Sequence, residues 1–233
     1  MVSVNAVLKQ VDKVLKQLEA KGTAHDLANL AKFGITASKP IGVSMKNIQA
    51  VARTVGRDHA LAEALWKTGV YEARLLAALV DVPSEVTPAQ MDRWCREFDN
   101  WGICDTVCFK LFDQSAHAWS RVPKWATQRG EFQKRAGFAL LACLAGHDKS
   151  ATESQFMTGL RLIEAGAADD RDLVAKGVSW ALRRIGTRNK KLHGAALVTA
   201  RRLAASDDPS ARWVGKDAVR DLSRPLVAKR FKS

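Results

Sequence analysis

The sequence predicts an all-α protein, on the strength of three observations. Apolar residues recur at helical spacing along almost the whole chain. Sustained alternation of Val, Ile, Thr and aromatic residues is nearly absent, and no Asn-Gly pair marks a hairpin turn. Capping residues and glycines interrupt the apolar pattern at short intervals. Together these features indicate many short helices joined by tight turns.

The helical periodicity, together with the capping residues and glycines that interrupt it, predicts thirteen helices along the chain. Four glycines lie where the apolar pattern lapses, which is typical of glycines that end a helix: Gly56, Gly69, Gly146 and Gly166. Thr87–Gln90 reads Thr-Pro-Ala-Gln, a capping box with Pro at the first helical position, and Asp208–Pro209 repeats this start. The predicted helices span 3–20, 23–33, 44–55, 58–68, 70–80, 88–98, 102–112, 115–126, 130–146, 151–166, 171–187, 190–205 and 209–222.

Three of these segments show a clear apolar stripe, which is the face that a helix buries against its neighbours. The stripes are Ile103, Val107 and Leu111 in the seventh helix, Phe132, Ala136, Ala139, Leu140 and Cys143 in the ninth, and Val174, Val178, Ala181 and Ile185 in the eleventh. In the ninth helix, Lys134 and Arg135 lie off the stripe and are expected to project elsewhere.

Connections this short make neighbouring helices pack mostly antiparallel. Two architectures meet this condition, a globular helical bundle and an α-solenoid of stacked helix pairs, and the absence of a strict sequence period leaves both open. No stretch resembles a long linker. We therefore expect one helical domain over residues 1–223 and a basic tail over residues 224–233.

Composition narrows the class of protein. The 37 Lys and Arg residues exceed the 24 Asp and Glu residues, so the net charge is +13, which suits either a polyanion partner or a merely basic soluble protein. No apolar run is long enough to span a membrane and the N-terminus lacks a signal-peptide core, so we expect a cytoplasmic protein. The four cysteines form no Cys-x-x-Cys pair, which favours buried free thiols over disulfides or a zinc site.

The eleventh helix places Trp180 one turn from Lys176 and Arg183, on a face other than the apolar stripe. Such a group can grip phosphates and stack on a base or sugar, although a Trp buried in the next helix layer would show the same spacing. The last helix repeats the pattern, because Arg212 and Lys216 flank Trp213. Successive helices that each present cations would form a basic stripe on a solenoid, which favours nucleic acid as the partner.

The stretch "DNWGICD" places Trp101 and Asp105 one turn apart, with Asp99 or Asn100 as the helix cap. An acid in a mostly apolar helix is costly to bury without a partner. Asp105 is therefore either bonded to a neighbouring backbone group or Arg, or placed beside the indole where it can stabilise a cationic species.

Four segments of the chain resemble the AlkD-type DNA alkylation repair family, and the resemblance runs from about Gly42 to Leu222. The segments are "GVYEARLLAALVDVP", "WCREFDNWGICDTVC", "EFQKRAGFALLACLAGHDK" and "DLVAKGVSWALRRIGTRNKKL", and "SARWVGKDAVRDL" extends the similarity. The resemblance implies an α-solenoid of HEAT-like antiparallel helix pairs with a concave basic surface.

The resemblance also implies an activity. Family members with glycosylase activity excise cationic N3- and N7-alkylated purines, using a Trp and an Asp from one helix, an Arg from another and a second Trp from a later one. Matched motif to motif, Trp101, Asp105, Arg135 and Trp180 would form this catalytic set. The flanking cations would bind DNA phosphates, and the full set expected to do so is Lys134, Lys176, Arg183, Arg188, Arg212 and Lys216.

The implied chemistry suits these residue types. A cationic alkylpurine is already a good leaving group, so the carboxylate of Asp105 has mainly to stabilise the positive charge that develops on the deoxyribose and to align a water. No metal or organic cofactor is required. The expected enzyme is a monofunctional glycosylase, a monomer acting on double-stranded DNA that contains alkylated bases, with no membrane partner.

Two positions depart from the family pattern. Gly102 follows Trp101 where some members carry an aromatic residue or an acid, and Arg184 stands where an acid often follows. The family also contains proteins that bind branched or distorted DNA with little or no excision. A non-catalytic DNA-binding protein is therefore the alternative, and a helical module that binds other proteins is the third possibility.

Overall fold

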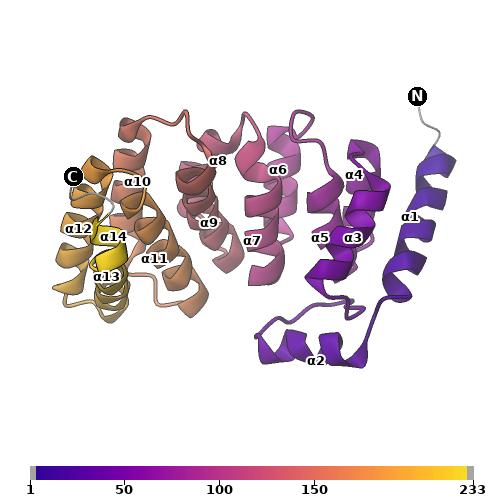
Figure 1. Ribbon diagram of the computed structural model, residues 1–233, viewed down its shortest axis with the longest axis horizontal. Coiled ribbons are helices and arrows are strands. Elements are labelled where there is room, and N and C mark those ends of the chain that lie inside the picture. Colours follow the sequence, from indigo (N-terminus) through magenta and orange to yellow (C-terminus); the bar gives the residue numbers. More distant parts are fainter. Residues whose placement is uncertain (1–3, 230–233) are drawn as a thin grey trace. The chain divides into compact units, whose positions relative to one another are not determined.

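The computed structural model describes residues 4–229, which fold into α-helices and one short 3-10 helix, without strands in this part of the chain (Figure 1). The chain forms two compact units, Met1–Ser115 (unit 1) and Ala116–Ser233 (unit 2). The helices of unit 1 are α1 (Val4–Glu19), α2 (Ala24–Lys32), α3 (Met45–Val55), α4 (His59–Lys67), α5 (Tyr71–Val80), α6 (Pro88–Arg96), α7 (Trp101–Lys110) and η1 (Phe112–Gln114). Those of unit 2 are α8 (Ala118–Ala126), α9 (Glu131–His147), α10 (Glu153–Gly166), α11 (Asp172–Gly186), α12 (Lys190–Ala204), α13 (Pro209–Leu222) and α14 (Pro225–Lys229).

The all-α prediction is confirmed, and each of the thirteen expected helices corresponds to one observed helix within a few residues. Two details differ. The seventh helix ends at Lys110 and continues as the 3-10 turn η1, and part of the expected tail forms α14. Residues 230–233 of that tail lie outside the described residues, and the single-domain expectation for residues 1–223 stays a prediction.

The two expected helix starts form as caps. The Thr87 hydroxyl accepts a hydrogen bond from the Gln90 backbone N–H, and the Asp208 carboxylate accepts one from that of Ala211. The Gln90 side chain does not complete the capping box. It donates instead to the buried carboxylate of Asp81, at 2.6 Å.

Unit 1 is built from alternate helices that pack side by side. Helix α5 packs between α3 and α7, while α4 packs on α5 and α1 lies against α3 and α4. An aromatic cluster fills part of the interior of unit 1, where Trp66 and Trp94 stack with ring centroids 4.0 Å apart, and Phe98 and Phe112 pack against them. The stripe Ile103, Val107 and Leu111 is buried as predicted.

Unit 2 repeats this arrangement. Helices α9, α11 and α13 pack in series, α8 and α12 pack on α9 and α13, and α10 packs against α11 and α12. Packing of each helix on both the next and the next but one is the signature of stacked helix pairs, which decides for the repeat architecture over a globular bundle. The predicted stripe of α11 is fully buried, as are Ala136, Ala139, Leu140 and Cys143 of α9.

Helix α2 is the exception in unit 1, because none of its residues is buried. It lies crosswise to α1, α3 and α5 (Figure 1). The loop that follows it is anchored by the buried carboxylate of Glu72, which accepts hydrogen bonds from the backbone N–H groups of Ile41, Gly42 and Val43 at 2.7 to 3.2 Å. Gly42 in turn accepts a hydrogen bond from the backbone N–H of Thr23, the N-cap of α2, at 2.9 Å.

All four cysteines are buried, as predicted, and none of them forms a disulfide. Within residues 4–229, none of the helices has the length and apolar character needed to cross a membrane.

Candidate nucleic-acid interface

Helix α7 begins within the "DNWGICD" stretch, and Asn100 rather than Asp99 is its cap. The Asn100 side-chain oxygen accepts a hydrogen bond from the Ile103 backbone N–H at 2.9 Å. Its amide nitrogen donates to the exposed carboxylate of Asp99 at 2.7 Å, so Asp99 orients the cap without making it. This start leaves Trp101 as the first residue of the helix.

The face of α7 that is not fully buried carries the two residues expected in the catalytic set and one further aromatic residue. Trp101, Asp105 and Phe109 follow one another at intervals of four residues, so they form one stripe along the helix. Trp101 and Asp105 are half-buried, and Phe109 is 38% exposed. Asp105 is therefore not a core acid. Phe109 was not singled out from the sequence, although its spacing from Trp101 and Asp105 could have indicated it.

Trp101 is held by a contact distant in sequence. Its indole Nε1 donates a hydrogen bond to the backbone carbonyl of Phe33, at 3.1 Å, where α2 ends. The Phe33 ring is 61% exposed, so an apolar side chain faces solvent next to the contact that orients Trp101. The hydrogen bond restricts the indole of Trp101 before any ligand arrives.

The structure accounts for Gly102, the first departure from the family pattern. A Cβ at this position would lie 2.7 Å from the Tyr71 hydroxyl and 3.2 Å from both Asn100 Oδ1 and Ile35 Cδ1. The Tyr71 phenol therefore occupies the space that a side chain would need. Burial, followed by the nearby carboxylates of Glu72 and Asp99, raises the pKa of Tyr71 to about 12, so its hydroxyl stays protonated beside α7.

Arg135 in unit 2 does not project from the surface as expected. It is only 6% exposed, and its Nη1 donates to the backbone carbonyl of Leu173 in the first turn of α11. The expectation failed because α9 lies between α8 and α11 and is buried on every side from Arg135 to Ala145. A single stripe does not describe a helix with neighbours all round.

Trp180 on α11 is half-buried, which is less than the burial of Trp66, Trp94 and Trp125. Of its flanking cations, Lys176 is exposed and pairs with Asp172 at 2.6 Å. Arg183 donates to Ser179 and to Asp217 of α13, so much of its charge is neutralised within unit 2.

Lys134 also lies in an ion-pair network. Its Nζ lies 2.8 Å from Asp169, and Arg171 contacts the same carboxylate at 2.6 Å. These hydrogen bonds, Arg171 first and then Lys134, hold the pKa of Asp169 well below its usual range. The network joins α9 to the loop before α11.

Of the remaining three cations expected to bind DNA, two have structural partners and one is exposed. Arg188 donates to the backbone carbonyls of Ala145, Asp148 and Ala151 and lies over the Phe156 ring, 4.5 Å from its centroid. Arg212 donates to the carbonyls of Ser206 and Asp207 ahead of α13, whereas Lys216 is exposed. Most of the predicted DNA-binding cations thus have a structural contact, and their contact with DNA stays a prediction, as does the concave basic surface.

The stacked pairs of helices define an all-helical protein of the HEAT-like repeat class. A family model described as DNA alkylation repair enzyme matches residues 14–222, so the chain belongs to that family. The sequence expectation of this family is confirmed.

A solved structure shares the fold with a TM-score of 0.75, over 90% of this chain and 94% of the other, at 20% sequence identity. That protein is described as one of a new family related to the HEAT-like repeat DNA glycosylases with affinity for branched DNA structures. No curated protein matches the sequence.

Proposed function

We propose that the protein is a monofunctional DNA glycosylase that releases cationic N3- and N7-alkylated purines from double-stranded DNA. The observation that carries the proposal is the stripe of Trp101, Asp105 and Phe109 on the solvent-facing side of α7. It places a carboxylate between two aromatic side chains in a member of the DNA alkylation repair enzyme family.

The reaction breaks the bond between C1′ and the purine nitrogen. The electron pair of this bond leaves with the purine and neutralises the positive charge of the alkylated ring, so little acid assistance is needed. Positive charge develops on the deoxyribose, and the Asp105 carboxylate stabilises it. A water held by Asp105 then attacks C1′ and gives up one proton to the Asp105 carboxylate, which returns it to solvent, and an abasic sugar remains.

The aromatic side chains supply binding surface. The indole of Trp101, oriented by the Phe33 carbonyl, presents a π face to the charged sugar or lesion. Trp180 of unit 2 offers a second indole to DNA. The exposed Lys176 and Lys216 contact phosphates. Arg135 acts as a positioning residue for α11, because its guanidinium is buried and bonded to the Leu173 carbonyl.

The experiment that tests the proposal is release of 7-methylguanine and 3-methyladenine from methylated duplex DNA. We expect wild-type protein to release these bases, and Asp105→Asn to lose at least about a hundredfold in rate, the scale on which removal of one transition-state contact acts. Asp12→Asn on the exposed face of α1 is the matched control and retains the wild-type rate. Equal background release by wild type and Asp105→Asn contradicts the proposal.

A second candidate is a DNA-binding protein without excision activity. It is favoured by the structural similarity to a protein with affinity for branched DNA. In this case the protein binds gapped or branched duplexes in a salt-dependent way, and Asp105→Asn binds them as tightly as wild type. The amount of base released is then the same for Asp105→Asn and wild type. A module that binds only other proteins would show no DNA affinity even at low salt.

A further inference from the structure

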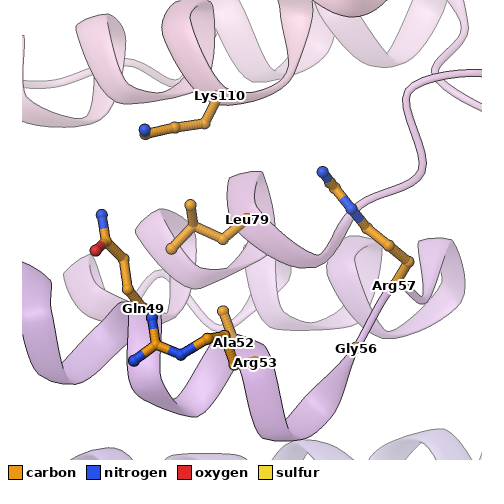
Figure 2. A pocket seen from close by; sticks show the side chains of 7 residues that line it. All are labelled: Gln49, Ala52, Arg53, Gly56, Arg57, Leu79 and Lys110. Carbon is orange, nitrogen blue, oxygen red and sulfur yellow. The ribbon is translucent and has the colours of Figure 1, made fainter.

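Unit 1 contains an open pocket lined by cations that the sequence did not indicate. It has a volume of about 430 Å³ and lies between α3 and α7. Figure 2 shows Lys110 of α7 on one side, Gln49 and Arg53 of α3 on the other, and Leu79 of α5 between them. Arg57, just after α3, closes one end.

The pocket forms because α5 is set deeper than its neighbours. Almost every residue of α5 is buried, so it offers only the half-buried Leu79 as a floor, while α3 and α7 form the walls. Gln49, Ala52, Arg53 and Gly56 follow one another at helical spacing and line the α3 wall.

The charge of the pocket is uniformly positive. Among the described residues that line it, none is acidic, and no ion pair in the described chain takes Arg53, Arg57 or Lys110. This differs from Lys134 and Arg183 in unit 2, whose charges are matched by carboxylates. Three cations around one concave surface create a positive potential that only an anionic ligand would offset.

Two of the cations are held in place. The Arg57 guanidinium donates to the backbone carbonyl of Asp81, and the Asp81 carboxylate is itself fixed by His59 at 2.7 Å and by Gln90 at 2.6 Å. The Lys110 Nζ lies over the Phe109 ring, 4.6 Å from its centroid. A cation held before binding loses less conformational freedom when the ligand arrives.

We infer that this pocket binds backbone phosphates of the DNA strand, at a position that flanks the α7 stripe. Lys110 directly follows Phe109, the last residue of the stripe, so the α7 wall of the pocket borders the stripe. The contact of Lys110 with Phe109 joins the pocket to the stripe. This inference rests on DNA as the partner in the proposed function, but it does not require excision.

The first test is the salt dependence of binding to an undamaged duplex, measured by fluorescence anisotropy. For Arg53→Gln/Lys110→Gln we expect the slope of log affinity against log salt to fall by about 1.8 relative to wild type, about 0.9 for each phosphate that the variant no longer neutralises. Arg57 is left unchanged because its hydrogen bond to Asp81 supports the fold. The control is Lys9→Gln/Lys13→Gln on α1, which removes the same charge and leaves the slope unchanged.

The second test locates the phosphate on the DNA. A methylphosphonate, which lacks the negative charge, replaces one phosphodiester at a time in the duplex. We expect one or two positions to weaken binding by wild type several-fold and to have no effect on Arg53→Gln/Lys110→Gln. Equal weakening of both proteins at every position overturns the inference, as does an unchanged salt slope or an equal fall in the α1 control.

The outcomes separate this inference from the proposed function. If wild type binds DNA with the expected pocket dependence but releases no base, excision fails and the phosphate site stands. If wild type releases alkylpurines, and the pocket variant has the same salt slope and the same response to each methylphosphonate as wild type, the phosphate site is wrong and the proposed enzyme activity stands. Absence of DNA binding at low salt overturns both. A thermal unfolding midpoint equal to that of wild type shows that the fold of a variant is intact.

Discussion

The indole nitrogen of Trp101 donates a hydrogen bond to the backbone carbonyl of Phe33, which joins the first residue of α7 to the end of α2. The opposite end of α2 is held through Thr23, whose N–H bonds the Gly42 carbonyl in the loop anchored by Glu72. Since α2 buries no residue, these contacts at its two ends position it on unit 1.

Trp101→Phe tests the hydrogen bond to the end of α2. The substitution keeps an aromatic ring but removes the N–H donor, so the Phe33 carbonyl loses its partner at a cost of about 1 kcal/mol. We expect faster amide hydrogen exchange in α2, with little change in α4 and α5. An unchanged exchange rate in α2 would show that the hydrogen bond does not hold it.

Gly102→Ala should destabilise unit 1 by about 1 to 3 kcal/mol, because the new methyl group overlaps the Tyr71 hydroxyl. Chemical denaturation measures the change. Gly194→Ala in α12 is the control, since nothing lies within 4 Å of its added Cβ, and it should stabilise by up to about 1 kcal/mol. Adding Tyr71→Phe to Gly102→Ala should recover part of the stability, and no recovery would contradict the assigned overlap.

Tyr71 is the single tyrosine of the chain, so the absorbance of tyrosinate reports on it alone. We expect a titration midpoint near the native pKa of about 12, and a midpoint near 10.0 once the chain is unfolded in denaturant. Because folding raises this pKa, the contribution of Tyr71 to stability is full below pH 10 and is lost as the pH rises toward 12. A native midpoint near 10 would mean that the phenol is exposed.

Glu72→Gln should lower the free energy of unfolding by about 3 kcal/mol. The carboxylate accepts three backbone N–H groups within unit 1, and an amide supplies only one acceptor oxygen and adds donors to the same site. The midpoint of urea unfolding measures the change. Glu85→Gln, which alters an exposed carboxylate, should leave the midpoint unchanged.

The pH dependence of the stability of Asp169→Asn tests the ion-pair network that Asp169 forms with Lys134 and Arg171. Folding lowers the pKa of the carboxylate from its ordinary 3.8, mainly through the hydrogen bond to Arg171, so its stabilising effect is full above that pH and is lost as the pH falls below it. We expect a lower thermal midpoint than wild type near neutral pH, with the difference shrinking below pH 3.8. A difference that stays constant with pH would exclude the carboxylate charge as its cause.

Local pattern was sufficient for much of the candidate site. Trp101 and Asp105 share a face because residues four apart are neighbours on any helix, and Ile103 and Val107 are buried because they lie on the opposite side. The same rule would have added Phe109, which extends the stripe by one more turn. The roles of these residues in excision stay predictions, since spacing alone does not specify chemistry.

The cations show where local pattern was insufficient. Periodicity placed Arg135 and Arg183 off the apolar stripes, and the family resemblance added Arg188 as a DNA contact. In the structure, Arg135 is buried, Arg183 contacts Asp217, and Arg188 binds three backbone carbonyls. Each of these partners lies 34 or more residues away in sequence. Charge counted along one helix therefore overstates the charge that the surface presents.

The helices, their buried stripes and the family could be predicted from the amino-acid sequence, because helix formation depends on contacts a few residues apart and the family motifs are read directly. Which polar groups lie open to a ligand became clear from the packing of the helices. This packing placed Tyr71 over Gly102, bonded Trp101 to Phe33, paired Lys134 and left the cations of the α3 and α7 pocket together. The reason is physical: these contacts depend on how whole helices pack, which brings together residues that helical periodicity cannot relate.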